Sequence, residues 1–153
     1  GKYNSIASIE MIEAVGQNYL EGYFKTIKNN LSNGGKTAIQ AITIDDKLFD
    51  RYKNKQDFIQ KYIFPGGFLP NKNNINRYVS ENGLAINSYI SYADHYANTL
   101  AIWRNEFLKK WDLIKNQGFD LTFKRMWEFY LCYCEAGFKS KNIDLIQFSM
   151  QNK

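Results

Sequence analysis

The sequence predicts an α/β fold, and three observations lead to this prediction. Short apolar runs recur along the 153 residues, segments with a helical spacing of apolar residues separate them, and Gly, Asn or Pro residues stand between the two kinds of segment. Such alternation is typical of helices layered on a sheet. With 44% hydrophobic residues, the chain has enough apolar material for one domain with a real core.

Four apolar runs are predicted to be β-strands. They cover residues 4–12, Lys36–Ile44, Leu84–Tyr92 and Ile143–Ser149. The first run begins almost at the start of the sequence, so we expect no upstream strand beside it within these residues. A carboxylate, Glu13, follows this first run. Ligands of α/β sheets bind beyond the carboxyl ends of the strands, which makes Glu13 a candidate site residue.

Helices are predicted between the strands, because apolar residues recur there every three or four positions. The Asn33-Gly34-Gly35 triplet is expected to end the first helix with a left-handed cap. No internal repeat, low-complexity linker or second domain is evident, so residues 1–153 are predicted to form a single domain. The predicted helices cover residues 17–32, 71–82, 94–116 and 120–138, with a polar helical insert at 46–61.

The composition narrows the classes of function. The net charge is +5, and its lysines are scattered apart from Lys139-Ser140-Lys141. Such a surplus is typical of a solvated surface rich in Lys and Asn. It also suits binding to nucleic acid or to an anionic membrane surface, and charge alone does not separate these two partners. No apolar run reaches the roughly 20 residues of a membrane span, and no signal peptide is recognisable. A soluble, cytoplasmic protein is therefore expected.

The cysteines and the histidine give no sign of a metal site. Cys132 and Cys134 lie two residues apart on a predicted helix, where their side chains point about 200° apart and cannot form a disulfide. They are expected to be free thiols that pack as small apolar groups, as in a reducing cytoplasm. His95 is the only histidine and is expected to be a surface or capping residue, so no zinc site is predicted.

The segment 62–70 is unusually apolar for a loop. It contains Tyr62, Phe64 and Phe68 and both prolines of the chain. One interpretation is a loop that covers the core of the protein. The other is an apolar wall or lid over a pocket for a lipid-like substrate. Because no Lys or Arg lies between Tyr62 and Pro70, nucleic-acid stacking is the weakest hypothesis, and no nucleic-acid partner is expected.

Four segments in order carry a resemblance to a known family: Ser8–Gly16, Tyr62–Pro70, His95–Leu100 and Phe123–Phe138. Together they resemble the C-terminal half of cyclopropane-fatty-acyl-phospholipid synthases and of the related mycolic-acid cyclopropane synthases. The likeness extends over nearly the whole chain. It implies the C-terminal half of a class I methyltransferase, a Rossmann-like sheet of seven strands of which these residues would supply strands four to seven.

The resemblance also implies an activity. Family members transfer the methyl group of S-adenosylmethionine to a cis double bond of a membrane phospholipid acyl chain, after which a proton leaves and a cyclopropane ring closes. A bicarbonate ion beside the reacting carbon is thought to accept that proton. The partner would be phospholipid acyl chains, reached at the inner membrane face. Relatives also make branched fatty acids or methylate amines, and a non-catalytic lipid-docking module is a further alternative.

The resemblance places the bicarbonate ligands on Glu13, Gln40, Ile42 and Tyr96, with Glu13 and Tyr96 as catalytic residues. Gln40 stands where the family has a histidine; its amide donates hydrogen bonds but carries no charge. The strand ends that precede these residues would meet at one edge of a parallel sheet, which agrees with a shared site. The alternatives are a helix N-terminal acid for Glu13, a core tyrosine for Tyr96 and a packing role for Gln40. Glu10 is expected to point to the opposite side of the first strand from Glu13.

Electrostatics adds two expectations. An anion beside an ionised carboxylate is unfavourable, so Glu13 would hold a proton or share one with the bicarbonate. A cation that forms on the acyl chain would be stabilised by aromatic faces. The resemblance and the loop composition make Tyr62, Phe64 and Phe68 the candidates for this substrate-pocket wall.

Residues 1–153 alone are predicted to bind S-adenosylmethionine weakly and to show no turnover. Class I methyltransferases hold this cofactor chiefly through the loop after their first strand and an acid after their second, and neither lies in residues 1–153; the cofactor-binding residues therefore stay unknown. The first strand is expected to be an unpaired edge, which favours pairing with a second copy as a homodimer. Calorimetric titration measures the affinity, and a micromolar dissociation constant would contradict the prediction.

Overall fold

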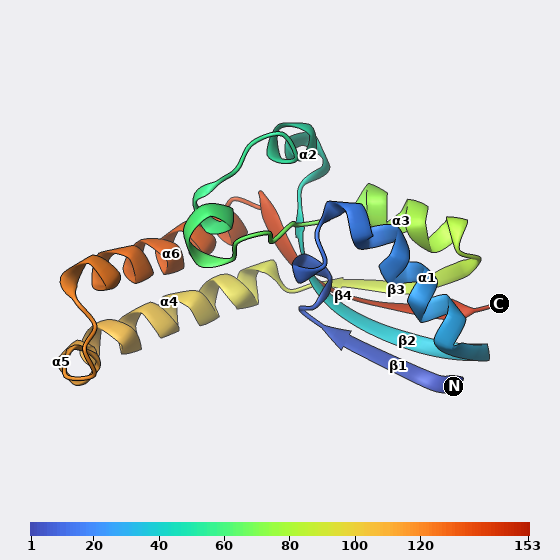
Figure 1. Cartoon of the computed structure of the whole chain (residues 1–153), viewed down its shortest axis with the longest axis horizontal. Helices are drawn as coiled ribbons and strands as arrows, with labels where there is room; N and C mark the ends of the chain where they lie inside the picture. Colours follow the sequence, from blue (N-terminus) through green and yellow to red (C-terminus); the bar gives the residue numbers. More distant parts are fainter. The chain divides into compact units, whose positions relative to one another are not determined.

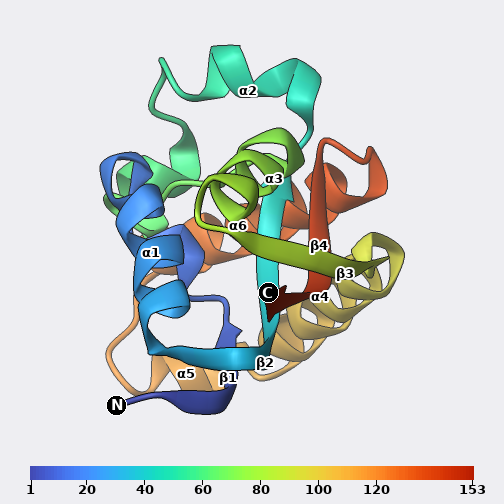
Figure 2. The same cartoon turned by 90° about the vertical axis from the view of Figure 1, so that its right-hand side faces the viewer.

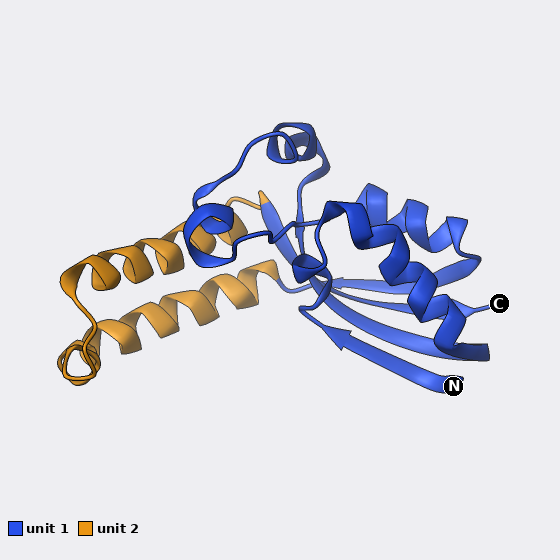
Figure 3. Ribbon diagram, in the orientation of Figure 1, with its two compact units in different colours: residues 1–92, 143–153 blue, residues 93–142 orange.

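The computed structural model describes residues 1–153, which divide into two compact units (Figure 3). Unit 1 comprises residues 1–92 and 143–153 and contains a four-stranded sheet with its helices. Unit 2 comprises residues 93–142 and is entirely helical. Unit 2 is thus an insertion between the last two strands of the chain.

The sheet of unit 1 contains all four predicted strands, in the order β1-β2-β4-β3. Strand β1 pairs parallel with β2, and β4 runs antiparallel to both β2 and β3. Consequently β1, β2 and β3 point in the same direction, and their carboxyl ends lie at one edge of the sheet. The strands are β1 (Tyr3–Ile9), β2 (Leu31–Ile44), β3 (Leu84–Ser91) and β4 (Ile143–Asn152).

Helices α1 (Leu20–Asn30) and α3 (Lys72–Glu81) lie on one face of this sheet (Figures 1 and 2). Both helices are amphipathic, and their buried residues join the apolar side chains of that face in one core. Because side chains alternate along a strand, every second residue of β2 and β4 contributes to the core. The fully or nearly fully buried members include Leu20, Phe24, Ile39, Ala41, Ile75, Val79, Ile146, Phe148 and Met150.

The opposite face of the sheet mixes polar and apolar side chains. On β2 it presents Gln40 and the exposed Lys36, which pair across the ladder with Gln147 and Gln151 of β4. Ser88 of β3 lies on this face, and its hydroxyl lies 2.9 Å from that of Ser149. The register also places the exposed Ile9 and Ile90 here, so this face has amide and hydroxyl groups that the face beneath α1 and α3 lacks, together with apolar side chains.

The predicted left-handed cap after the first helix is wrong. Helix α1 ends at Asn30, and Leu31 is already extended, with φ −89° and ψ 129°. The glycines instead serve an irregularity of β2, whose pairing with β1 shifts between Leu31 and Lys36. Gly34 has φ +70°, and a Cβ on Gly35 would lie 2.8 Å from the Ser32 carbonyl oxygen. The fully buried Leu31 anchors the strand before this bulge.

The insert at 46–61 is helical in two separate pieces. Helix α2 (Asp46–Tyr52) begins at Asp45, whose side chain accepts a hydrogen bond from the Lys47 amide at 2.9 Å. The second piece, η3 (Ile59–Ile63), is a π-helical turn that includes Tyr62 from the predicted loop. The chain then returns to the sheet, where Ile44 forms an isolated parallel bridge with Asn71.

Unit 2 is a helical hairpin of α4 (Ala93–Lys109) and α6 (Leu121–Lys139), joined by the short α5 (Trp111–Lys115) (Figure 1). The long helix predicted over 94–116 is therefore interrupted at Lys110, where α4 gives way to α5. Asp120 begins α6 by accepting a hydrogen bond from the Phe123 amide at 2.8 Å. No helix of the chain is long and apolar enough to cross a membrane.

A buried carboxylate joins the two long helices of the hairpin. Glu135 of α6 is paired with Arg104 of α4 at 3.2 Å and with Lys139 at 2.5 Å. Arg104 also donates a hydrogen bond to Cys132 Sγ at 3.1 Å. Cys132 and Cys134 form no disulfide bond, as predicted. Because removal of one partner would leave an uncompensated buried charge, this group fixes the register of α4 against α6.

An Ile→Val substitution is expected to lower the stability on one face of the sheet and to leave it nearly unchanged on the other. Ile146 on β4 is fully buried, whereas Ile90 on the neighbouring β3 is half-exposed. Ile146→Val is expected to lower the free energy of unfolding by about 0.5–1.5 kcal/mol, because it leaves a small cavity. Ile90→Val is the matched control and should stay within about 0.5 kcal/mol of the wild type. Urea unfolding measures both, and equal losses would contradict the assignment of the faces.

Candidate active site

Glu13 lies just beyond the carboxyl end of β1. The predicted strand over 4–12 ends at Ile9, because Glu10 adopts φ +49° and turns the chain away from the sheet. The Glu10 amide still donates to the Gln40 carbonyl oxygen at 2.9 Å, which keeps the turn attached to β2. A single 3₁₀ turn, η1 (Ile12–Ala14), follows. Ile12 is fully buried in the core and so fixes the neighbouring Glu13 at the edge of the sheet.

The Glu13 carboxyl group connects two strand ends. Its Oε1 atom accepts a hydrogen bond from the backbone amide of Ile42 at 2.5 Å. Its Oε2 atom is buried and has no hydrogen-bond partner. The backbone carbonyl of Glu13 accepts from the Phe68 amide at 2.8 Å. Glu13 therefore joins the end of β1 to β2 and to the segment 62–70. Its direct bond to Ile42 differs from the prediction that both residues contact a bicarbonate ion, and that shared role stays a prediction.

Burial raises the pKa of Glu13 above its ordinary value of 4.5. Hydrogen bonds from the Ile42 amide and from its own backbone oppose this effect, and the nearby charge of Glu10 adds to it. In the neutral carboxyl the proton belongs on Oε2, because Oε1 already accepts from Ile42. A protonated Glu13 thus presents a buried donor without an acceptor, which is an uncommon state in a folded protein.

Gln40 is held by neighbours other than Glu13. Its Nε2 atom donates to Glu10 Oε1 at 2.8 Å, and its Oε1 atom accepts from Gln147 Nε2 at 2.8 Å. This chain of three side chains fixes the orientation of the amide on the face of β2 opposite α1 and α3. Gln40 and Ile42 lie on the same face of the strand, since they are two residues apart.

The expected opposition of Glu10 and Glu13 across a strand does not apply. Both residues lie after the end of β1, so the alternation of a strand does not govern them. Their charges are close enough for Glu10 to raise the pKa of Glu13. Glu10, with its left-handed backbone, and Gln147 are site residues that sequence reasoning missed. Only the pairing register could have revealed Gln147, which faces Gln40 across the ladder.

The three predicted wall residues separate into two environments. Phe68 is buried in the core, with ring centroids 5.8 Å from Phe49 and 5.6 Å from Tyr52. Tyr62 and Phe64 are more than half exposed. The interpretation of a loop that covers the core is confirmed for Phe68, whereas Tyr62 and Phe64 present their rings at the surface. The wall or lid over a pocket for a lipid-like substrate stays a prediction.

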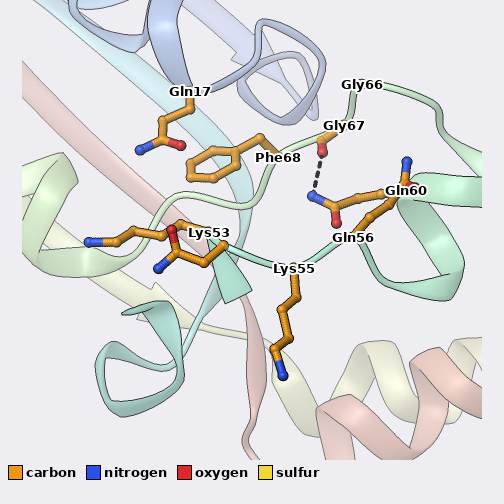
Figure 4. Close-up of a pocket in the computed structure, with 9 residues that line it drawn as sticks. Gln17, Lys53, Lys55, Gln56, Gln60, Gly66, Gly67 and Phe68 are labelled. Atoms are coloured by element: carbon orange, nitrogen blue, oxygen red, sulfur yellow. Dashed lines mark hydrogen bonds between the residues drawn. The ribbon is translucent and has the colours of Figure 1, made fainter. Parts of the chain in front are cut away.

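A polar hollow of about 390 Å³ opens beside Phe68 (Figure 4). Gln60 spans one side of it, donating to the Gly67 carbonyl oxygen at 3.1 Å and to the Tyr52 hydroxyl at 3.2 Å. The same hydroxyl accepts from the Leu69 amide at 2.9 Å, which holds the segment in place. Such a lining suits a polar or anionic group rather than an acyl chain. The other lining residues are Gln17, Lys53, Asn54, Lys55, Gln56 and Gly66.

Tyr96 belongs to unit 2 and lies in the first turns of α4. It is half-buried, and its ring packs edge-on against Phe138 and Trp103, at centroid distances of 5.0 Å and 6.2 Å. These contacts match the alternative of a packing tyrosine within the hairpin. The proximity of Tyr96 to Glu13 stays a prediction. His95 is exposed, as expected of a surface residue.

The fold and the site together define a class of protein. A strand that runs antiparallel between two parallel strands, with a carboxyl group beyond the end of the first strand, matches the C-terminal part of α/β methyltransferase domains. Among solved structures, the chain resembles mycolic acid cyclopropane synthase CmaA1 complexed with SAH and CTAB, with a TM-score of 0.85 and 26% identity. That likeness covers 98% of this chain and 55% of the other.

The sequence relatives identify the family. The profile described as mycolic acid cyclopropane synthetase matches residues 1–148, so the chain belongs to this family. Over 151 residues it is 43% identical to tuberculostearic acid methyltransferase UfaA1 of Mycobacterium tuberculosis, covering 98% of this chain and 35% of that protein. It is also 32% identical to the cyclopropane-fatty-acyl-phospholipid synthase of Escherichia coli, covering 95% of this chain and 37% of that protein.

The predicted family and the predicted methyltransferase fold are thereby confirmed. The chain spans about a third of the length of these curated relatives. The comparisons leave the individual site residues, the bicarbonate and the substrate as predictions.

Glu13→Gln is expected to remove one pH-dependent component of stability. Burial raises the pKa of Glu13 in the folded state, so its contribution is full below the ordinary value of 4.5 and is lost as pH rises through the folded pKa. Gln is always neutral and can still accept from the Ile42 amide. Between pH 4 and pH 8, the free energy of unfolding of the variant should therefore rise relative to that of the wild type.

Chemical denaturation at each pH measures this difference. Glu21→Gln, which changes an exposed carboxylate at the start of α1, is the control and should not reproduce the trend. Wild-type and Glu13→Gln curves that stay parallel over this range would show that Glu13 is ionised without cost in the folded protein.

Proposed function

We propose that these residues form part of an enzyme that transfers one carbon from S-adenosylmethionine to the double bond of an unsaturated phospholipid acyl chain, with closure of a cyclopropane ring. Membership of the cyclopropane synthetase family supports this proposal. Two relatives act, by name, on a fatty acid and on fatty-acyl phospholipids.

The observation that carries the proposal is the unpartnered Oε2 atom of Glu13. It is buried at the edge of the sheet where β1 and β2 end, the place where α/β folds bind their ligands. A protonated carboxyl there is a hydrogen-bond donor that faces no acceptor in the protein. Such a donor fits a small oxyanion as its acceptor. The carboxyl group must be protonated for this contact, because an ionised carboxylate would repel the anion.

We infer that this oxyanion is bicarbonate, with the side chains of Glu13, Gln40 and Tyr96 as its ligands. The backbone amide of Ile42 donates to Glu13 Oε1, so Ile42 would act on the ion by orienting Glu13. The ion would supply, when bound, a base near the reacting carbon. Glu13 would hold its own proton on Oε2 and orient the ion by donating to it. Gln40 would contribute an amide of fixed orientation, because Glu10 and Gln147 hold both of its ends. Replacement of the family's histidine by Gln40 means that the ion gains no imidazolium charge here.

S-adenosylmethionine would supply an electrophilic methyl group on a sulfonium. Addition of this methyl to one alkene carbon leaves a positive charge on the other, and loss of a proton from the added methyl closes the ring. The protein must therefore stabilise a cation and accept a proton in a site without bulk water. The exposed rings of Tyr62 and Phe64 are the candidates for cation stabilisation, whereas Phe68 is buried against Phe49 and Tyr52.

A second candidate product is a methyl-branched acyl chain. The higher identity, 43% against 32%, is to the tuberculostearic acid methyltransferase rather than to the cyclopropane synthase. The two outcomes share the methyl transfer. Loss of a proton from the added methyl closes the ring, whereas loss of a proton from a chain carbon next to the cation restores a double bond and leaves a methyl-branched alkene. A substrate within phospholipid also implies that the enzyme works at the membrane surface, and we propose peripheral attachment to the inner face.

The test is the lipid product of the full-length gene product that contains these residues. Mass spectrometry of lipids from expressing cells should detect cyclopropane rings in phospholipid acyl chains. Glu13→Gln is expected to lower turnover by about 100-fold or more, the typical worth of a positioned acid or base, while S-adenosylmethionine affinity stays unchanged. Glu10→Gln is the matched control, because it keeps a partner for Gln40, and should cost less than about tenfold.

The outcomes separate the hypotheses. Methyl branches in place of rings would select the second candidate. Full activity of the Glu13→Gln variant would overturn the assigned role of Glu13. Lipid binding with neither product nor cofactor affinity would favour the non-catalytic docking module.

A further inference from the structure

The end of the helical hairpin at which α5 joins α4 to α6 combines exposed apolar and cationic side chains. We call residues 109–125 the hairpin tip; α5 marks it in Figure 1. Leu113, Phe119 and Leu121 are 66%, 42% and 59% exposed there. Three large apolar side chains on one short turn are more than the single exposed residues that any surface carries.

Positive charge surrounds these apolar residues. The hairpin tip contains five basic residues and two acidic ones, so its net charge is +3. One of the two carboxylates, Asp120, is occupied in capping α6. Lys109 and Lys110 pair with Glu106 of α4, at 3.0 Å and 3.9 Å. Lys115 and Arg125 form no ion pair and so carry positive charge without a nearby carboxylate. The basic residues are Lys109, Lys110, Lys115, Lys124 and Arg125.

Packed aromatic rings lie beneath the exposed residues of the hairpin tip. Phe119 and Phe123 lie 4.4 Å apart between ring centroids, and Phe107 contacts both Phe123 and Trp111 at 6.3 Å and 5.9 Å. Lys124 Nζ lies 5.2 Å from the centre of the Trp111 ring. The exposed apolar side chains therefore project from a packed platform, so their exposure persists without a partner.

We propose that the hairpin tip docks on an anionic phospholipid surface, with Leu113, Phe119 and Leu121 entering the headgroup–acyl boundary and the basic residues contacting lipid phosphates. Interfacial attachment combines buried apolar area with attraction of Lys and Arg to anionic lipid. Long basic side chains can reach the phosphates while apolar neighbours insert. A protein partner is the poorer match, because protein interfaces are depleted in lysine.

This inference deepens the proposed function, since it assigns the surface through which an enzyme of membrane lipids reaches its substrate. Binding to vesicles requires neither cofactor nor turnover. Failure of the docking and failure of the chemistry can therefore be observed separately.

The test is cosedimentation of residues 1–153 with vesicles of phosphatidylcholine alone or mixed with phosphatidylglycerol. Binding is expected to the mixed vesicles, to weaken with salt, and to be at least about tenfold weaker without the anionic lipid. All three tryptophans, Trp103, Trp111 and Trp127, belong to unit 2. Brominated acyl chains should therefore quench tryptophan fluorescence of the bound protein, with Trp111 at the hairpin tip quenched most.

Variants locate the contact. The double variant Leu113→Ser/Leu121→Ser is expected to reduce binding about tenfold or more, and Lys115→Glu/Arg125→Glu to reduce it at least as far. Ile102→Ser is the matched control, because Ile102 is equally exposed, at 61%, but lies in the body of α4. Circular dichroism and urea unfolding check that each variant folds.

Two results would overturn the proposal. If the Ile102→Ser variant lost as much binding as the tip variants, the hairpin would contact the membrane along its length and not through residues 109–125. Unchanged binding in both tip variants, or no binding of the wild type to anionic vesicles, would exclude docking through residues 109–125.

Discussion

The hydrogen bond from the Ile42 amide to Glu13 Oε1 is the contact on which the geometry of the candidate site depends. It ties the end of β1 to the end of β2 beyond the last residue pair of the parallel ladder, and the Glu13 carbonyl ties the same point to the segment 62–70. Because Oε1 is committed to this bond, Oε2 is the atom left for the proposed contact with a ligand. Burial raises the pKa of the same carboxyl group above its ordinary value.

Much of this arrangement could be predicted from the sequence, because hydrophobic periodicity reports burial directly. The four strands and the amphipathic helices follow from the apolar pattern, and the position of Glu13 after the first strand followed with them. The placing of Glu13 and Ile42 in one candidate site came instead from the family resemblance, and the direct hydrogen bond between them was found only in the structure. The face of the sheet opposite α1 and α3, by contrast, depended on register, so the link from Gln40 to Gln147 was not foreseen.

The wrong secondary-structure predictions have a common physical origin. At each position, the local preference of the sequence competes with the packing of side chains from distant parts of the chain. Asn33-Gly34-Gly35 has the local chemistry of a helix cap, but the buried Leu31 starts the strand first and leaves the glycines to a bulge. The apolar pattern over 94–116 is continuous, yet the chain breaks at Lys110 to turn the hairpin. The segment 62–70 is uniformly apolar in sequence, and only the packing of Phe68 on Phe49 separates its buried half from its exposed half.

The place of the helical hairpin in the chain has a consequence for how such enzymes diversify. Residues 93–142 connect β3 and β4, which are antiparallel neighbours in the sheet. At the point where the insertion begins, the Tyr92 amide donates a hydrogen bond to the Leu145 carbonyl oxygen at 2.7 Å. The hairpin is therefore a greatly enlarged turn between two adjacent strands. Because the entropy of closing such a connection changes slowly with its length, the turn can be lengthened, shortened or replaced at little thermodynamic cost to the sheet. Sequence and length can then change in this one connection while the strand ends beside Glu13 stay unchanged.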